Sequence, residues 1–125
     1  MIYGIGIDTE IVGRVEKLLA EHGDYVGRIF TAGERMAAKK FPLEKRARFY
    51  ASAFAGKEAV MKSLGTGWSA EVEWFEIETP IGDSGTAKLF GASAKFAEKI
   101  GVSRIFVSLS ATSEFVAATA IAETD

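Results

Sequence analysis

The segment from Leu43 to Leu64 limits the possible folds most, because it predicts one long helix without a polar side. Pro42 suits the start of a helix, and Gly65-Thr66-Gly67 ends it. Small or apolar residues lie on both sides of the helical wheel: Ala47, Ala51, Phe54 and Ala55 on one, and Phe49, Ala53, Val60 and Leu64 on the other. We therefore predict that this helix is central and buried.

Size and composition restrict the classes of function. The chain has 125 residues and a mass of 13.4 kDa, so we predict a single domain over residues 1–125. It has no cysteine and one histidine, which excludes thiolate catalysis, cysteine-based metal sites and multi-histidine metal sites. We expect no membrane span, no signal peptide and no nucleic-acid partner, given the short apolar runs and a pI of about 5.5. A chain without cysteine suits the reducing cytoplasm.

The N-terminal segment alternates in side-chain character and predicts a strand over residues 2–8. Alternate residues share a face: Tyr3, Ile5 and Ile7 on one side, and Gly4, Gly6 and Asp8 on the other. Glycine on a strand face usually indicates close approach by another element. A helix is predicted from Thr9 to about Glu21, so Asp8 is either a functional carboxylate at the strand end or a helix N-cap.

The remaining pattern predicts helices first and strands later. Thr31 and Glu34 have the spacing of a capping box, which opens a short helix to about Lys40. The second half favours a strand over 71–79, a turn over 82–85, a strand over 86–90, a helix over 91–100, and a hairpin of strands 103–111 and 115–122. We predict an α+β fold in which an antiparallel sheet packs on the long central helix.

Three charged residues have the chemistry of a magnesium–phosphate site. Asp8 and Glu58 lie on otherwise apolar or glycine faces, and Lys62 follows Glu58 by one helical turn. A buried carboxylate must be paired or bind a metal, because its desolvation is costly. Two carboxylates suit Mg²⁺, and the cation together with Lys62 would neutralise phosphate oxygens. The simpler interpretation is an ordinary helix pair of Glu58 and Lys62.

Two further features could serve a phosphate ligand. Backbone N–H groups of Gly65-Thr66-Gly67 could approach a phosphate, although this turn could equally be only a helix C-cap. Residues 35–48 hold six cations against Glu44 alone: Arg35, Lys39, Lys40, Lys45, Arg46 and Arg48. Such a patch attracts phosphates or an acidic protein, or is simply a solvated helical face. We expect the lone His22 to be a surface residue.

Two motifs and two shorter stretches follow one another along the chain. The first motif is Gly4-Ile5-Gly6-Ile7-Asp8, followed by Ile11 and Arg14. The second is Phe54-Ala55-Gly56-Lys57-Glu58-Ala59-Val60-Met61-Lys62, followed by Leu64-Gly65-Thr66-Gly67. The shorter stretches are Phe30-Thr31 with Glu34, and Val107-Ser108-Leu109-Ser110. In these segments the chain resembles the holo-acyl-carrier-protein synthases, and the resemblance covers nearly the whole chain in the same order.

The resemblance implies a 4′-phosphopantetheinyl transferase-like fold and a homotrimer with active sites between subunits. It implies Mg²⁺-dependent transfer of the 4′-phosphopantetheine arm from coenzyme A to a serine of apo acyl carrier protein, with release of 3′,5′-ADP. Asp8 and Glu58 would be the metal ligands, Lys62 a catalytic pyrophosphate contact, and Arg14 would face the acidic carrier protein. We expect Arg28, an exposed cation shortly after the first helix, to belong to the same carrier-protein dock. Further coenzyme A contacts would be Lys45, Arg46, Gly65, Thr66 and Ser108.

The expected mechanism is attack of the carrier serine on the β-phosphate of coenzyme A, with Glu58 as the candidate base. Ala111 and Ala53 stand where family members usually carry histidine and arginine. A weakened or non-catalytic coenzyme A-binding trimer is therefore one alternative, and another Mg²⁺-dependent phosphate-processing enzyme is a second. The apolar residues Trp68, Trp74 and Phe75, expected on the strand over 71–79 and just before it, also favour an oligomer.

Overall fold

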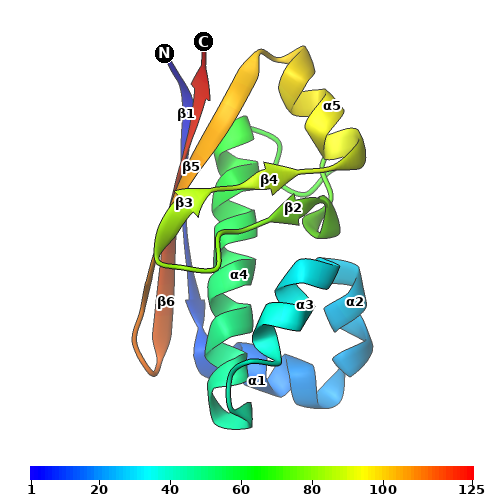
Figure 1. The fold of residues 1–125 in the computed structure, drawn as a ribbon, viewed down its shortest axis with the longest axis vertical. Coiled ribbons are helices and arrows are strands. Elements are labelled where there is room, and N and C mark those ends of the chain that lie inside the picture. The colour runs from blue at the N-terminus through cyan, green and yellow to red at the C-terminus, as the bar shows by residue number, and fades with distance from the viewer.

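Helix α4 (Leu43–Leu64) runs through the middle of the molecule in a computed structural model that describes residues 1–125 (Figure 1). The other helices are α1 (Val12–Glu21), α2 (Val26–Ile29), α3 (Ala32–Ala38) and α5 (Gly91–Lys99). The strands are β1 (Ile2–Ile11), β2 (Ile77–Glu78), β3 (Ser84–Thr86), β4 (Lys88–Leu89), β5 (Val102–Ala111) and β6 (Phe115–Thr124). No helix has the length and hydropathy needed to cross a bilayer.

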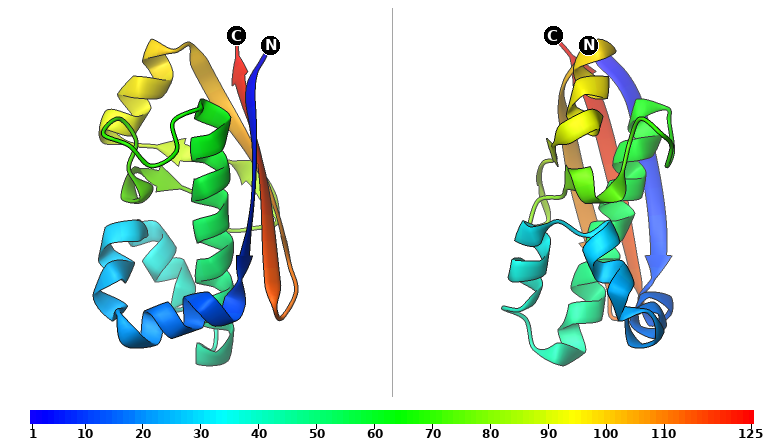
Figure 2. Two further views of the ribbon diagram at one scale, coloured as in Figure 1. Left: turned by 180° about the vertical axis from the view of Figure 1, so that it is seen from behind. Right: turned by 90° about the vertical axis from the view of Figure 1, so that its right-hand side faces the viewer.

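One face of an antiparallel sheet covers α4. The strand order is β1-β6-β5-β3, and the helices lie on the other side of α4 from the sheet (Figures 1 and 2). Small residues meet at this interface, because Ala118, Ala120 and Ala122 of β6 and Ala55 and Ala59 of α4 are at most 1% exposed. The predicted α+β fold with a buried central helix is confirmed.

The glycines of β1 allow the strand to lie directly on α4. A Cβ on Gly4 would overlap the carbonyl oxygen of Ser63, and one on Gly6 would overlap that of Ala59. The predicted close approach is therefore confirmed. From Gly4 to Gly6 the strand advances two residues, while its contact on α4 moves back one turn, from Ser63 to Ala59. The next two residues therefore bring Asp8 beside the preceding turn of α4, which contains Glu58.

The prediction for the end of β1 was wrong. The strand continues to Ile11, because Asp8, Thr9, Glu10 and Ile11 pair with successive residues of β6 as far as the β5–β6 turn. Helix α1 begins only at Val12, and Ile11 is its N-cap without a side-chain bond. Asp8 therefore lies within the ladder, and the alternative interpretation of Asp8 as an N-cap is excluded.

The predicted strand over residues 71–79 was also wrong. A 3₁₀ turn occupies Trp74–Glu76, and only Ile77–Glu78 form strand β2. Side chains hold this segment in place of a ladder: the Lys57 ammonium donates to the carbonyls of Trp74 and Ile77, and the Glu76 carboxylate accepts the N–H groups of Ala92 and Ser93. The Lys57 bonds satisfy carbonyl groups that a longer strand would have paired, and the Glu76 bonds satisfy free N–H groups in the first turn of α5.

The predicted strand over 86–90 is divided between two sheets. The first part, β3, begins at Ser84 inside the predicted turn and pairs with β5, whereas β4 pairs with β2. The other predictions agree with the structure to within two residues, including the capping box of Thr31 and Glu34, helix α5 and the β5–β6 hairpin.

The outer face of the sheet is apolar and exposed. Tyr3, Ile5 and Ile7 of β1 and Phe106 of β5 are 43–63% exposed there. This face lies opposite the one that packs on α4, so the molecule has a second apolar surface without a partner inside the chain.

Candidate active site

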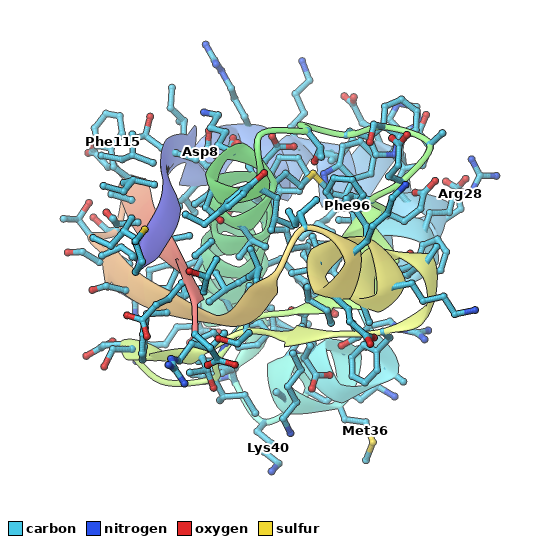
Figure 3. All side chains as sticks on the ribbon, turned by 90° about the horizontal axis from the view of Figure 1, so that it is seen from above. Asp8, Arg28, Met36, Lys40, Phe96 and Phe115 are labelled. Atoms are coloured by element: carbon cyan, nitrogen blue, oxygen red, sulfur yellow. The ribbon has the colours of Figure 1, made fainter.

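Asp8 lies where β1 passes beside α4 (Figure 3), and Lys62 of α4 meets it there. The ammonium of Lys62 donates to Oδ1 of Asp8 at 3.1 Å and to the carbonyl oxygen of Ile7 at 3.0 Å. The other carboxylate oxygen of Asp8, Oδ2, is buried and has no hydrogen-bond partner. A buried carboxylate oxygen without a donor is costly, so this atom indicates a missing cationic or protic partner.

Glu58 lies one turn before Lys62 on α4 and is half-buried. The indole Nε1–H of Trp74 donates to Oε1 of Glu58 at 2.9 Å. The Glu58 charge also acts on Glu10 of β1, so the strand and the helix present their carboxylates to the same region.

Glu10 is a third carboxyl group at this place, and sequence reasoning missed it. Burial first, and then the neighbouring side chain and the charge of Asp8, raise the pKa of Glu10 to about 7. The Glu58 charge raises this pKa further, and Arg14 opposes it. The alternation of Gly6 and Asp8 would have placed Glu10 on the same face if the strand had been extended by three residues.

Asp8 and Glu58 have the donor chemistry of a magnesium site that other ligands would complete. No group of three or more histidine, aspartate or glutamate side chains is arranged to hold a metal by itself. Magnesium commonly takes only one or two protein carboxylates and fills its octahedron with water and substrate phosphate. The unpartnered Oδ2 of Asp8 supplies an anionic donor of the type that this cation prefers.

A buried ion pair between α3 and α4 lies next to the site. The ammonium of Lys57 lies 2.6 Å from Oε1 of Glu34, and both side chains are at most 1% exposed. Glu34 also accepts bonds from Thr31 and Thr79, so the pair joins α3, α4 and the segment before β3. The sequence indicated Glu34 through its capping box and a family-like stretch, and it indicated no separate role for Lys57.

The predicted coenzyme A contacts at the basic end of α4 are only partly brought together. A hollow of about 250 Å³ is lined by Lys45 and Arg48, and also by Ala53 and Ala111, the two positions that depart from the family pattern. Arg46 instead donates to the carbonyl oxygens of Phe41 and Lys39, which end the α3 segment. Lys40, between α3 and α4, projects outward from the molecule (Figure 3).

The remaining predicted contacts lie at two separate places. Gly65 has a φ of 80° and ends α4, where the Thr66 hydroxyl donates to the carbonyl oxygen of Gly67. Ser108 lies on the outer face of the sheet, opposite Ser84 and Thr119. Because α4 covers the inner face, Ser108 is separated from Asp8 within one chain.

An apolar groove borders the carboxylates on the helical side of the molecule. Two adjoining hollows share Leu18, Tyr25, Ile29 and Phe54. Glu10 and Arg14 line the first, of about 120 Å³; Arg28 and Trp74 line the second, of about 580 Å³. Arg28 also lies over the ring of Tyr25, and Figure 3 shows it projecting away from the core. His22 is exposed and stacks on Tyr25, as expected of a surface residue.

Known proteins match this chain over nearly its full length. A family model described as the 4′-phosphopantetheinyl transferase superfamily matches residues 4–120. A holo-[acyl-carrier-protein] synthase of Solibacter usitatus is 40% identical over 115 residues, which covers 90% of each chain. The Chlamydia pneumoniae protein of the same name is 40% identical over 124 residues, covering 97% of each chain.

Solved structures of the same group share the fold. The holo-[acyl-carrier-protein] synthase of Neisseria meningitidis has a TM-score of 0.86 at 32% identity and covers 99% of this chain and 100% of its own. The Bacillus anthracis protein, solved in complex with CoA (3′,5′-ADP), has a TM-score of 0.78 at 30% identity. The match covers 100% of this chain and 99% of the Bacillus anthracis chain. The chain therefore belongs to the holo-acyl-carrier-protein synthase family within the 4′-phosphopantetheinyl transferase superfamily.

Proposed function

We propose that the chain, as one transferase domain over residues 1–125, moves the 4′-phosphopantetheine group from coenzyme A to a serine of apo acyl carrier protein. The family supports this activity, since the relatives are named holo-[acyl-carrier-protein] synthase and the Bacillus anthracis protein was solved in complex with CoA (3′,5′-ADP). The structural observation that carries the site assignment is Asp8, whose buried Oδ2 lacks a partner beside Lys62 and Glu58.

Asp8 and Glu58 would hold Mg²⁺, which when bound supplies positive charge to the phosphoryl oxygens. Lys62 adds a second positive charge from its position between the Asp8 carboxylate and open solvent, since its side chain is 49% exposed. An ammonium on a flexible stem can leave the Ile7 carbonyl for a phosphate oxygen without loss of its charge. Lys62 would therefore contact the pyrophosphate of coenzyme A and stabilise the charge that develops in transfer.

Glu58 would take the proton that the carrier serine loses. The serine oxygen attacks the β-phosphorus of coenzyme A, a new phosphorus–oxygen bond forms, and the bond to the 3′,5′-ADP leaving group breaks. The indole of Trp74 occupies Oε1 of Glu58, and no group of the chain bonds to Oε2. Because Oε2 would also face the cation, the serine proton would reach Glu58 through a water beside it.

A homotrimer would complete the site. Asp8 and Ser108 lie on opposite faces of the sheet, so a coenzyme A molecule that touches both positions needs two subunits. The exposed apolar face of Tyr3, Ile5, Ile7 and Phe106 gives a subunit contact of suitable chemistry. This support differs from the physical part of the sequence argument, which used Trp68, Trp74 and Phe75 in addition to the family resemblance. Trp74 is half-buried and donates to Glu58, and the turn it begins is not a strand.

The other coenzyme A contacts follow from the basic hollow. Lys45 would meet the 3′-phosphate, and Arg48 lies in the same hollow, whereas Arg46 would first have to release two carbonyl oxygens. Gly65 and Thr66 would lie near the pyrophosphate, one turn beyond Lys62. The acidic carrier would dock on Arg14 and Arg28, which line the apolar groove that leads to Glu10. The cytoplasmic location stays a prediction.

Mass measurement of a carrier protein tests this function. Apo acyl carrier protein, coenzyme A and MgCl₂ are incubated with the chain, and the carrier should gain one phosphopantetheine as 3′,5′-ADP is released. EDTA should prevent both changes, and added MgCl₂ should restore them. Bound coenzyme A with an unmodified carrier would favour the non-catalytic alternative. Cleavage of coenzyme A without carrier modification would favour a different phosphate-processing enzyme.

A further inference from the structure

Trp74 is fixed from three directions at the point where its indole meets Glu58. The ammonium of Lys57 donates to its carbonyl oxygen at 3.0 Å. Its ring stacks on Trp68, with centroids 5.0 Å apart and planes at 2°, and it also contacts Phe54 at a centroid distance of 5.9 Å. A side chain held in this way presents its N–H donor in one direction.

The bond from Trp74 determines which oxygen of Glu58 is available. Indole nitrogen is a donor only, so the oxygen that it contacts is always the acceptor. The bond to Oε1, 2.9 Å long, restricts rotation of the carboxylate and leaves Oε2 without a partner in the chain. A side chain that hydrogen-bonds to a metal ligand, without touching the metal, orients that ligand before the metal binds.

We infer that Trp74 is a positioning residue, which orients the Glu58 carboxylate for the divalent cation through its indole N–H. The inference rests on the proposed function, because it assigns Glu58 to the metal. It also connects the buried pair to the site, since Lys57 holds the backbone of the residue that orients Glu58. The segment 74–76 is a turn in place of a strand, and this geometry allows the indole to reach α4.

Removal of the N–H with retention of the ring tests the inference. Trp74→Phe keeps an aromatic ring beside Trp68 and Phe54 but cannot donate to Glu58. Loss of a hydrogen-bond partner of a metal ligand typically weakens metal binding by roughly 10- to 100-fold. With Mn²⁺ as the probe in place of Mg²⁺, we therefore expect Trp74→Phe to bind the ion at least about tenfold more weakly than the wild type. Free Mn²⁺ would be measured by electron paramagnetic resonance, without coenzyme A or carrier.

Trp68→Phe is the matched control. It makes the same chemical change in the same aromatic stack, but the Trp68 indole donates to Glu73 and not to Glu58. The Mn²⁺ affinity of Trp68→Phe should stay within about twofold of the wild type. The urea midpoint of unfolding should be unchanged in both Trp68→Phe and Trp74→Phe. Equal affinities in the wild type and Trp74→Phe, or equal losses in both variants, would overturn the inference.

The indole signals give a second test that needs no metal. The chain has two tryptophans, so a nitrogen–proton correlation spectrum contains two indole peaks. Glu58→Gln should shift the Trp74 peak and leave the Trp68 peak nearly in place; an unmoved Trp74 peak would overturn the inference. Absence of Mn²⁺ binding by the wild type would overturn the metal site of the proposed function. The indole peaks would then still decide whether Trp74 bonds to Glu58.

Discussion

Lys57 and Glu34 form a buried ion pair, with the ammonium nitrogen 2.6 Å from Oε1 and neither side chain more than 1% exposed. Burial lowers the pKa of Lys57, while the charge of Glu34 opposes that shift. The Lys57 ammonium also donates to the carbonyls of Trp74 and Ile77, and Glu34 accepts from Thr31 and Thr79. Each charge is thus matched and hydrogen-bonded, as a buried charge requires.

Lys57→Met should strongly destabilise the fold. The substitution leaves the Glu34 carboxylate buried without a cation, which costs about 3–5 kcal/mol when one partner of such a pair is removed. Urea unfolding followed by circular dichroism measures this change. The double variant Lys57→Met, Glu34→Gln should recover part of the loss, because it buries no charge. A double variant less stable than Lys57→Met would contradict the role of charge.

Gly6→Ala should push β1 away from α4. The added methyl group would overlap the carbonyl oxygen of Ala59, and backbone cannot move aside as a flexible side chain can. Overpacking of this kind costs about 1–3 kcal/mol. Mn²⁺ affinity should fall as well, since Asp8 follows Gly6 on the same face.

Gly13→Ala is the control for that substitution. Nothing lies within 4 Å of a Cβ at Gly13, which is inside helix α1. Alanine is favoured over glycine in a helix by about 0.5–1 kcal/mol, so this variant should be slightly more stable than the wild type with unchanged Mn²⁺ affinity. Equal stability losses at both glycines would contradict the close packing of β1 on α4.

Glu10 should make stability without metal depend on pH. Its pKa rises from 4.5 to about 7 on folding, so between these values the folded chain holds a proton that the unfolded chain has lost. The free energy of unfolding should therefore fall as the pH rises from about 4.5 to about 7. Solvent screens this partly exposed group, which limits the effect to on the order of 1 kcal/mol.

Glu10→Gln isolates that contribution. In EDTA, the variant and the wild type should differ little near pH 4.5, and the variant should be the more stable of the two near pH 8. Urea midpoints at five or six pH values give the comparison. Parallel pH profiles for both proteins would show that Glu10 titrates alike in the folded and unfolded chain.

Long periodic elements were predictable from the sequence, and side-chain-supported segments were not. Helix α4 was placed correctly because Pro42 and Gly65 mark its ends and its apolar pattern covers many turns. The segment around Trp74 alternates like a strand, yet Lys57 from outside it binds its carbonyl groups, and its own Glu76 binds the start of α5. Such bonds join residues 17 positions apart, which no local pattern contains.

The site shows the same division. The proximity of Asp8, Glu58 and Lys62 was predictable, because charge on an apolar or glycine face is visible in the sequence. Glu10 was missed because Ile11 fits the helical period of α1 as well as the strand, and only pairing with Phe115 of β6 decides between them. Trp74 was assigned to a sheet face, because nothing in its neighbourhood indicates that its N–H meets Glu58.

Arg14 and Arg28 should set the rate at which an acidic carrier protein associates. Both are exposed cations that line the apolar groove beside the carboxylates. Charge reversal at Arg14 should raise the KM for the carrier by roughly tenfold, at the low end of the range for electrostatic steering. The KM for coenzyme A should stay nearly unchanged. Added NaCl should also slow the wild type at low carrier concentration, because the Debye length is about 8 Å at physiological ionic strength.

Two further variants separate docking from other effects of this change. Arg14 also lowers the pKa of Glu10, so Arg14→Glu could act through the carboxylates. Arg28 does not act on Glu10, and Arg28→Glu should raise the KM for the carrier in the same way. Lys99→Glu reverses an exposed charge on α5, at the opposite end of the molecule from α1 (Figure 1), and should leave carrier kinetics unchanged. If Arg14→Glu alone has an effect, and disturbs coenzyme A as strongly as the carrier, then Arg14 belongs to the site and the groove is not the dock.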